Sequence, residues 1–70
     1  MIDINTRFAK RLRELRISHK LTQERLAELA GIDYKHLQDM EGKCPSAPTL
    51  VTLEKLAKAF KISLSKLLDF

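Results

Sequence analysis

The chain has 70 residues with one cysteine, and its 44% hydrophobic and 31% charged residues are typical of one soluble globular domain covering 1–70. A domain of this size buries only about 60% of the surface that its unfolded chain exposes, so its small core leaves little room for an enzyme pocket. One cysteine excludes an internal disulfide, no apolar run approaches the roughly 18 residues of a membrane span, and the N-terminus lacks the apolar segment of a signal peptide. We therefore expect a cytoplasmic protein that is not an enzyme.

The formal net charge of +4 is unevenly distributed along the chain. Residues 1–25 contain seven Lys and Arg against three Asp and Glu, whereas residues 26–70 contain six of each sign. A basic segment on a small domain favours a polyanionic partner, usually nucleic acid. Charge alone leaves open the alternative of a solvated helix face in a basic protein.

The first predicted helix covers Asn5 to His19. Phe8, Leu12 and Leu15 recur at i, i+4 and i+7, which places them on one helical face, while Arg and Lys occupy the other faces. Arg16 lies beside this apolar face rather than opposite to it. We expect this helix to contribute one side of the core.

The stretch 22–41 predicts two short helices joined by a tight turn. Thr22 and Asp33 are good N-caps, because each side chain can accept a hydrogen bond from a first-turn amide of the helix that follows it. Gly31 lies between the two helices, where a left-handed residue ends a helix at little steric cost. The expected helices are Gln23–Ala30 and Tyr34–Glu41.

Two further helices follow a loop over residues 42–48, in which two prolines keep the chain extended. Thr49 is the expected cap of the fourth helix, and Ser63 is the expected cap of a short fifth helix. The apolar stripe of the fourth helix consists of Leu50, Leu53, Leu56, Ala57 and Phe60. Because no stretch predicts a strand, we expect an all-α, compact five-helix fold.

This order of helices resembles the Cro/lambda-repressor type of helix-turn-helix family, also called XRE-like. The resemblance covers nearly the whole chain, from about Phe8 to Leu68. The residues that support it are Leu15–Arg16, LTQERLAELAGI at 21–32, Glu41, Pro48 and LEKLAKAFKISLSKLL at 53–68. It implies a lambda-repressor-like DNA-binding domain with the helix-turn-helix proper at 22–41.

The resemblance also implies which residues contact DNA. The expected base contacts are Tyr34, Lys35, Gln38 and Asp39. The expected phosphate contacts are Thr22, Gln23, His36, Lys43 and Ser46. A lysine side chain can donate hydrogen bonds to guanine, and a glutamine side chain can bond adenine. The start of a helix presents free backbone amides that can bind a phosphate. Several alternatives remain open: Lys35 and Gln38 can be solvated surface, Tyr34 can pack on the preceding helix, and Asp39 can repel phosphates.

The resemblance bears on four further residues, and a fifth, Cys44, is interpreted without it. Arg16 and Glu41 match a family pair that forms an internal ion pair, which we interpret as structural. Lys20 stands where the family commonly has glycine, and Gly42 comes one residue earlier than the family's usual glycine. Cys44 is interpreted as a small loop residue, with redox sensing left open.

The C-terminal residues are more apolar than a free chain end requires. The expected dimer interface consists of Leu64, Leu67, Leu68 and Phe70, and the alternative is that these residues close the monomer core. We predict a transcriptional regulator, a repressor that binds a palindromic double-stranded DNA operator as a homodimer. The alternative is a protein-interaction or antitoxin-like module, which Asp33 and Asp39 favour. We expect no cofactor, metal, small-molecule ligand or membrane partner.

Overall fold

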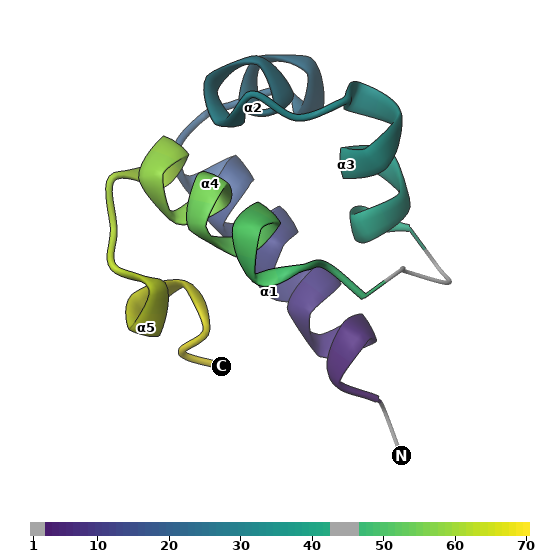
Figure 1. The fold of residues 1–70 in the computed structure, drawn as a ribbon, viewed down its shortest axis with the longest axis vertical. Helices are drawn as coiled ribbons and strands as arrows, with labels where there is room; N and C mark the ends of the chain where they lie inside the picture. Colours follow the sequence, from purple (N-terminus) through teal and green to yellow (C-terminus); the bar gives the residue numbers. More distant parts are fainter. Residues whose placement is uncertain (1–2, 43–46) are drawn as a thin grey trace.

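The computed structural model describes residues 3–42 and 47–70, and it contains helices and no strand within those ranges. The helices are α1 (Ile4–Ser18), α2 (Gln23–Ala30), α3 (Tyr34–Glu41), α4 (Leu50–Phe60) and α5 (Leu64–Leu67), arranged as in Figure 1. The prediction of an all-α fold with five helices is therefore confirmed. None of these helices is long and apolar enough to cross a membrane.

Each helix begins at a side-chain cap that the local sequence supplies. The Thr22 hydroxyl accepts a hydrogen bond from the Arg25 amide at 3.0 Å, and the Asp33 carboxylate accepts one from the Lys35 amide at 2.9 Å. Thr49 and Ser63 cap α4 and α5 in the same way, as predicted. Such caps satisfy amides that have no partner inside the helix.

The first helix begins one residue earlier than predicted, because Asp3 is its N-cap. The Asp3 carboxylate accepts a hydrogen bond from the backbone amide of Thr6 at 2.9 Å. This backbone hydrogen bond, together with that from the Thr6 side chain, lowers the pKa of the Asp3 carboxyl below its ordinary value of 3.8. The carboxylate form is therefore the one that the helix start stabilises.

Three residues with positive φ lie at helix ends: Lys20 just after α1, Gly31 at the end of α2 and Lys61 at the end of α4. Gly31 has φ +68°, the left-handed conformation predicted for it, and ends α2. Lys20 has φ +57° just after α1, at the position where the family commonly has glycine. Gly42, in contrast, ends α3 in extended backbone with φ −80° and ψ −177°. A non-glycine residue at positive φ is strained, so Lys20 costs the fold some stability.

One apolar core joins all five helices. Its fully buried large side chains are Leu12, Leu26, Leu37, Met40, Leu56 and Leu67. The predicted stripe of α4 is wrong at Leu50, which is 76% exposed because the first residue of α4 projects beyond the helices packed around the core. Leu67, one of the four residues expected in a dimer interface, is 0% exposed within a single chain, which agrees with the alternative that it closes the monomer core.

Candidate nucleic-acid interface

A buried carboxylate at the end of α3 connects three helices. Glu41 has a side chain only 2% exposed, and it accepts hydrogen bonds from the Arg16 Nε at 3.0 and 3.2 Å. The Gln23 side-chain amide donates to the same carboxylate at 3.3 Å. The structure therefore contains the Arg16–Glu41 ion pair that the family resemblance implied, and it adds Gln23 to it. A buried carboxylate needs such partners, because an unpaired buried charge is costly.

Two arginines of α1 also hold the backbone around this carboxylate. Arg16 donates from its Nη1 to the Leu21 carbonyl at 2.9 Å, just before α2 begins. Arg13 donates to the carbonyl of Glu41 at 3.3 Å, where α3 ends and its last carbonyls lack partners inside the helix. The direction of α3 is therefore held from α1 at its C-terminal end.

The turn between α2 and α3 holds the other end of α3. The Gly31 amide donates to the Glu28 carbonyl at 3.2 Å, and the Ile32 amide donates to the Ala27 carbonyl at 3.0 Å. This pattern ends α2 with its carbonyls satisfied, and the Asp33 cap then begins α3 immediately. The two helices are thus joined with little conformational freedom between them.

The exposed face of α3 carries all four candidate base contacts. Tyr34, Lys35, Gln38 and Asp39 are exposed and occupy one helical face, whereas Leu37 and Met40 on the opposite face are buried. His36 is partly buried at the margin of that face. The structure therefore brings the four side chains together on a helix fixed at both ends.

Three of the five candidate phosphate contacts, Thr22, Gln23 and His36, lie among the described residues. Thr22 and Gln23 lie at the start of α2, where free amides and the helix dipole favour an anion. The Gln23 amide donates one hydrogen to Glu41, which leaves its second hydrogen for another acceptor. Lys43 and Ser46, like Cys44, lie outside the described residues.

The basic N-terminal segment is largely engaged within the protein, which sequence reasoning did not foresee. Five of its seven cationic side chains donate to backbone carbonyls or carboxylates; they are Arg7, Arg11, Arg13, Arg16 and Arg25. The charge asymmetry therefore does not by itself mark a DNA surface. Among residues 3–42 and 47–70, no three His, Cys, Asp or Glu side chains are grouped to hold a metal ion.

The helix order, the tight α2–α3 turn and the exposed face of α3 define a lambda-repressor-like helix-turn-helix domain. Residues 12–67 match the family model described as helix-turn-helix. The chain is 38% identical to the restriction-modification controller protein C.AhdI from Aeromonas hydrophila, with a TM-score of 0.84 over 90% of this chain and 94% of that one. It is 28% identical to the prophage Lp1 protein 11, with a TM-score of 0.86 over 100% of this chain and 92% of that one.

A longer relative shares the same region. The HTH-type transcriptional regulator PuuR of Escherichia coli (strain K12) is 40% identical over 57 residues, which are 81% of this chain and 30% of PuuR. This chain therefore spans about a third of the length of that relative. With the family model matching most of its length, the chain belongs to the XRE-type helix-turn-helix family.

Proposed function

We propose that this chain is a sequence-specific double-stranded DNA-binding transcriptional regulator that acts as a repressor. In this proposal α3 enters the major groove and α2 lies across the DNA backbone. The observation that carries it is the exposed face of α3, which the Glu41 network holds against α1 and the start of α2. The relatives support a regulatory role, since one is a transcriptional regulator and another is a restriction-modification controller protein.

The four proposed base contacts lie in two successive turns of α3. Tyr34 and Lys35 lie in its first turn, and Gln38 and Asp39 lie one turn, or roughly 5 Å, further on. The Lys35 ammonium can donate to guanine O6 and N7, the Gln38 amide can bond adenine, and the Asp39 carboxylate can accept from a cytosine amine. This arrangement suits the reading of a few successive base pairs by one helix.

The phosphate contacts would come from the start of α2 and from the margin of α3. The Thr22 hydroxyl oxygen accepts a hydrogen bond from the Arg25 amide, so its own hydrogen can still be donated to a phosphate oxygen. Gln23 keeps one amide hydrogen for the same purpose, and His36 lies at the edge of the reading face. In this proposal these groups fix the position of the protein on the DNA without carrying sequence information.

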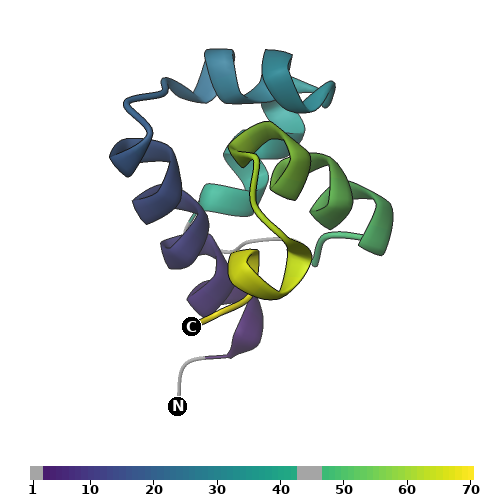
Figure 2. The same cartoon turned by 90° about the vertical axis from the view of Figure 1, so that its left-hand side faces the viewer.

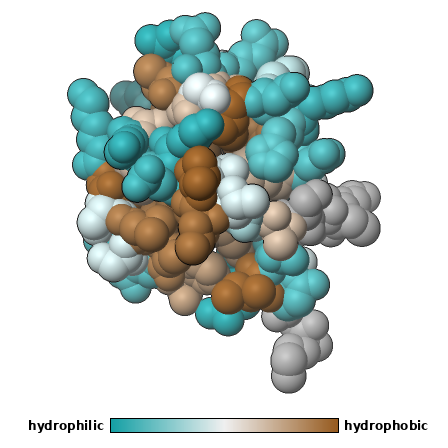
Figure 3. Space-filling model, viewed as in Figure 1, coloured by the Kyte–Doolittle hydropathy of each residue, from teal (hydrophilic) through white to brown (hydrophobic). Residues whose placement is uncertain are grey.

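One module of this size buries limited DNA surface, so we propose a two-fold symmetric homodimer that reads half-sites about 34 Å apart. The proposed interface retains Leu64, Leu68 and Phe70, which are exposed, and omits the buried Leu67. Figure 3 supports this choice, because apolar side chains gather on the face that carries α4 and α5, whereas the part over α2 and α3 is mostly hydrophilic. In Figure 2, α5 lies in the foreground and α3 behind the other helices, so the proposed interface leaves α3 free.

The protein-interaction alternative loses part of its support. Asp33 is engaged as the cap of α3, so Asp39 is the acid on the reading face that still favours it. The Asp39 carboxylate can accept a hydrogen bond from a cytosine amine. The DNA-binding proposal therefore accounts for both Asp33, as a helix cap, and Asp39, as a base contact.

The test is selection of bound duplexes from a random library at roughly physiological salt, followed by sequencing. We expect enrichment of a two-fold symmetric motif whose half-site centres are about 10 base pairs apart. The Lys35→Ala, Gln38→Ala double variant is the matched control, because it keeps the fold and should lose the motif. A folded wild-type protein that enriches no motif would contradict the proposal.

A further inference from the structure

Residues 66–70, which we name the C-terminal segment, carry two of the side chains proposed for the dimer interface. Leu68 is 39% exposed and Phe70 is 40% exposed, whereas Leu67 is buried in the core. The segment continues from α5, a helix of four residues, and a helix that short does not hold its own conformation. The positions of Leu68 and Phe70 therefore depend on contacts with the rest of the fold.

Apolar packing around Phe70 is incomplete. A hollow of about 200 Å³ separates the C-terminal segment from the starts of α1 and α4, and its lining includes Ile4, Phe8, Leu53, Leu68 and Phe70. The Phe8 and Phe70 rings form one tilted aromatic pair, with their centroids 6.2 Å apart. Side chains that line a hollow lack neighbouring atoms on one side, so dispersion holds them less firmly than core side chains. Packing alone therefore leaves the segment weakly held beyond Leu67.

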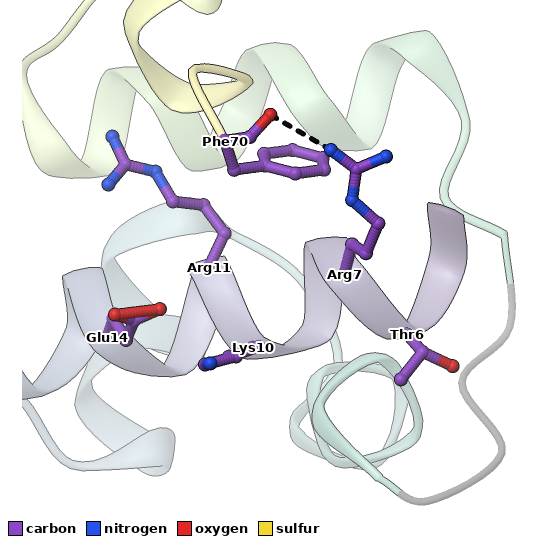
Figure 4. Close-up of a pocket in the computed structure, with 6 residues that line it drawn as sticks. All are labelled: Thr6, Arg7, Lys10, Arg11, Glu14 and Phe70. Carbon is purple, nitrogen blue, oxygen red and sulfur yellow. Dashed lines mark hydrogen bonds between the residues drawn. The ribbon is translucent and has the colours of Figure 1, made fainter. Parts of the chain in front are cut away.

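Two arginines of α1 hold the backbone of the C-terminal segment. Arg7 donates from its Nη2 to the Phe70 carbonyl at 3.2 Å, and its guanidinium lies 5.3 Å from the centroid of the Phe70 ring. Arg11 donates to the Lys66 carbonyl at 2.9 Å and to the Leu67 carbonyl at 3.4 Å. Figure 4 shows the two arginines extending from α1 on either side of Phe70. Their charged donors bind carbonyls at the end of α5, where a helix leaves its last carbonyls without internal partners.

We propose that Arg7 and Arg11 are positioning residues of the homodimer, because they hold the C-terminal segment where Leu68 and Phe70 face the second protomer. This inference rests on the proposed homodimer and adds to it two residues outside its apolar interface. The arginines act through the segment and need not touch the second protomer. Without them, each protomer would have to order its own segment when the dimer forms, and that ordering costs affinity.

The size of the effect depends on how often the segment is in place. A protein that is competent to bind for only a fraction of the time binds more weakly by that fraction. A two-fold interface uses the same segment of both protomers, so the fraction enters twice. A roughly threefold loss of order in each protomer should therefore raise the dimer dissociation constant about tenfold.

The test measures the dimer dissociation constant by sedimentation for the wild type and for Arg7→Ala, Arg11→Ala and Lys10→Ala. Lys10 lies on α1 between the two arginines and is directed away from Phe70 in Figure 4, so its replacement removes an equal charge and is the matched control. We expect each arginine variant to weaken the dimer about tenfold and the lysine variant to dimerise as the wild type does. Circular dichroism should show unchanged helix content, because the core side chains are kept.

A second measurement separates positioning from direct contact with the second protomer. It uses NMR relaxation of the backbone amides in a Leu64→Lys background, at concentrations where sedimentation shows only monomers. Residues 68–70 should be ordered there, and Arg11→Ala should lower their order parameters below about 0.6. Arg11→Lys should recover part of the order and part of the dimer affinity, because one ammonium keeps the charge but loses the fork of donors that reaches two carbonyls.

Two results would overturn the positioning role while the homodimer stands. The first is a dimeric wild type whose affinity stays unchanged in both arginine variants. The second is a weakened dimer whose C-terminal segment remains ordered in the monomer, which would mean that the arginines contact the second protomer directly. A wild type that stays monomeric at every concentration would contradict the homodimer itself, and the positioning role would fall with it.

Discussion

The Gln23 side-chain amide donates a hydrogen bond to the Glu41 carboxylate at 3.3 Å, across 18 residues of sequence. This bond joins the first residue of α2, a candidate phosphate contact, to the buried acid that ends α3. The Arg16 guanidinium holds the same carboxylate at 3.0 Å. The start of α2 and the end of α3 are thus positioned by one shared group.

Replacing Glu41 with Ala should destabilise the protein strongly. The Arg16 guanidinium, which is only 16% exposed, would remain without its anion. We expect the free energy of unfolding to fall by roughly 3 kcal/mol, measured by chemical denaturation. The Arg16→Met, Glu41→Leu double variant is the control and should lose less, because it leaves no unpaired charge. A single variant as stable as the wild type would show that the ion pair contributes nothing.

Replacing Gln23 with Ala should affect both stability and DNA affinity. One hydrogen bond to a charged group is lost, so the free energy of unfolding should fall by about 1–2 kcal/mol. DNA affinity should fall to a similar extent for all operator sequences, because a phosphate contact carries no base information. The slope of affinity against salt should stay unchanged, because the glutamine side chain is neutral and releases no counterion. A change in base preference would contradict this role.

Replacing Lys35 or Gln38 with Ala should relax base preference without affecting the fold. Both side chains are exposed on α3, so thermal stability should be unchanged. Each variant should lose about 1–3 kcal/mol of discrimination at its own base pair, measured by competition between operator duplexes. Equal weakening on every sequence would mean that the residue contacts phosphate instead.

Replacing Lys20 with Gly should stabilise the protein. Lys20 has φ +57°, which costs a side-chain-bearing residue about 1–2 kcal/mol, whereas glycine costs about 0.5–1 kcal/mol through the unfolded chain. We expect a net gain of about 0.5 kcal/mol and a higher melting temperature. Lys55→Gly in the interior of α4 is the control and should lose about 1 kcal/mol. A loss of stability from Lys20→Gly would indicate that the lysine side chain makes a favourable contact.

Charged substitutions along α5 should separate the core from the proposed dimer interface. The Leu64→Lys, Leu68→Lys double variant should fold as a monomer, because both side chains are more than a third exposed in the single chain. Leu67→Lys should fail to fold, because it would bury an unpaired ammonium. Sedimentation and circular dichroism measure the two outcomes. A double variant that sediments like a dimeric wild type would place the interface elsewhere.

Helices, caps and family could be predicted from the sequence because they depend on residues close together along the chain. Thr22 and Asp33 bond amides two or three residues away, and Gly31 adopts its left-handed backbone locally. The spacing of apolar residues then predicted the inward face of α3, and the family resemblance implied which residues on its outward face contact bases. These local signals determined that the chain is an all-α helix-turn-helix domain.

The partners of the longer side chains were decided only by tertiary packing. Arg7 bonds a carbonyl 63 residues away, and Gln23 is joined to Glu41 across 18 residues, so neither contact has a local signature. The apolar residues of α5 look alike in sequence, yet packing buries Leu67 and exposes its neighbours. The sequence by itself determined the helices and the exposed face of α3, because their causes lie within one helical turn. Which charges are engaged and which leucine enters the core depends on how separate helices meet, and only the folded structure decides that.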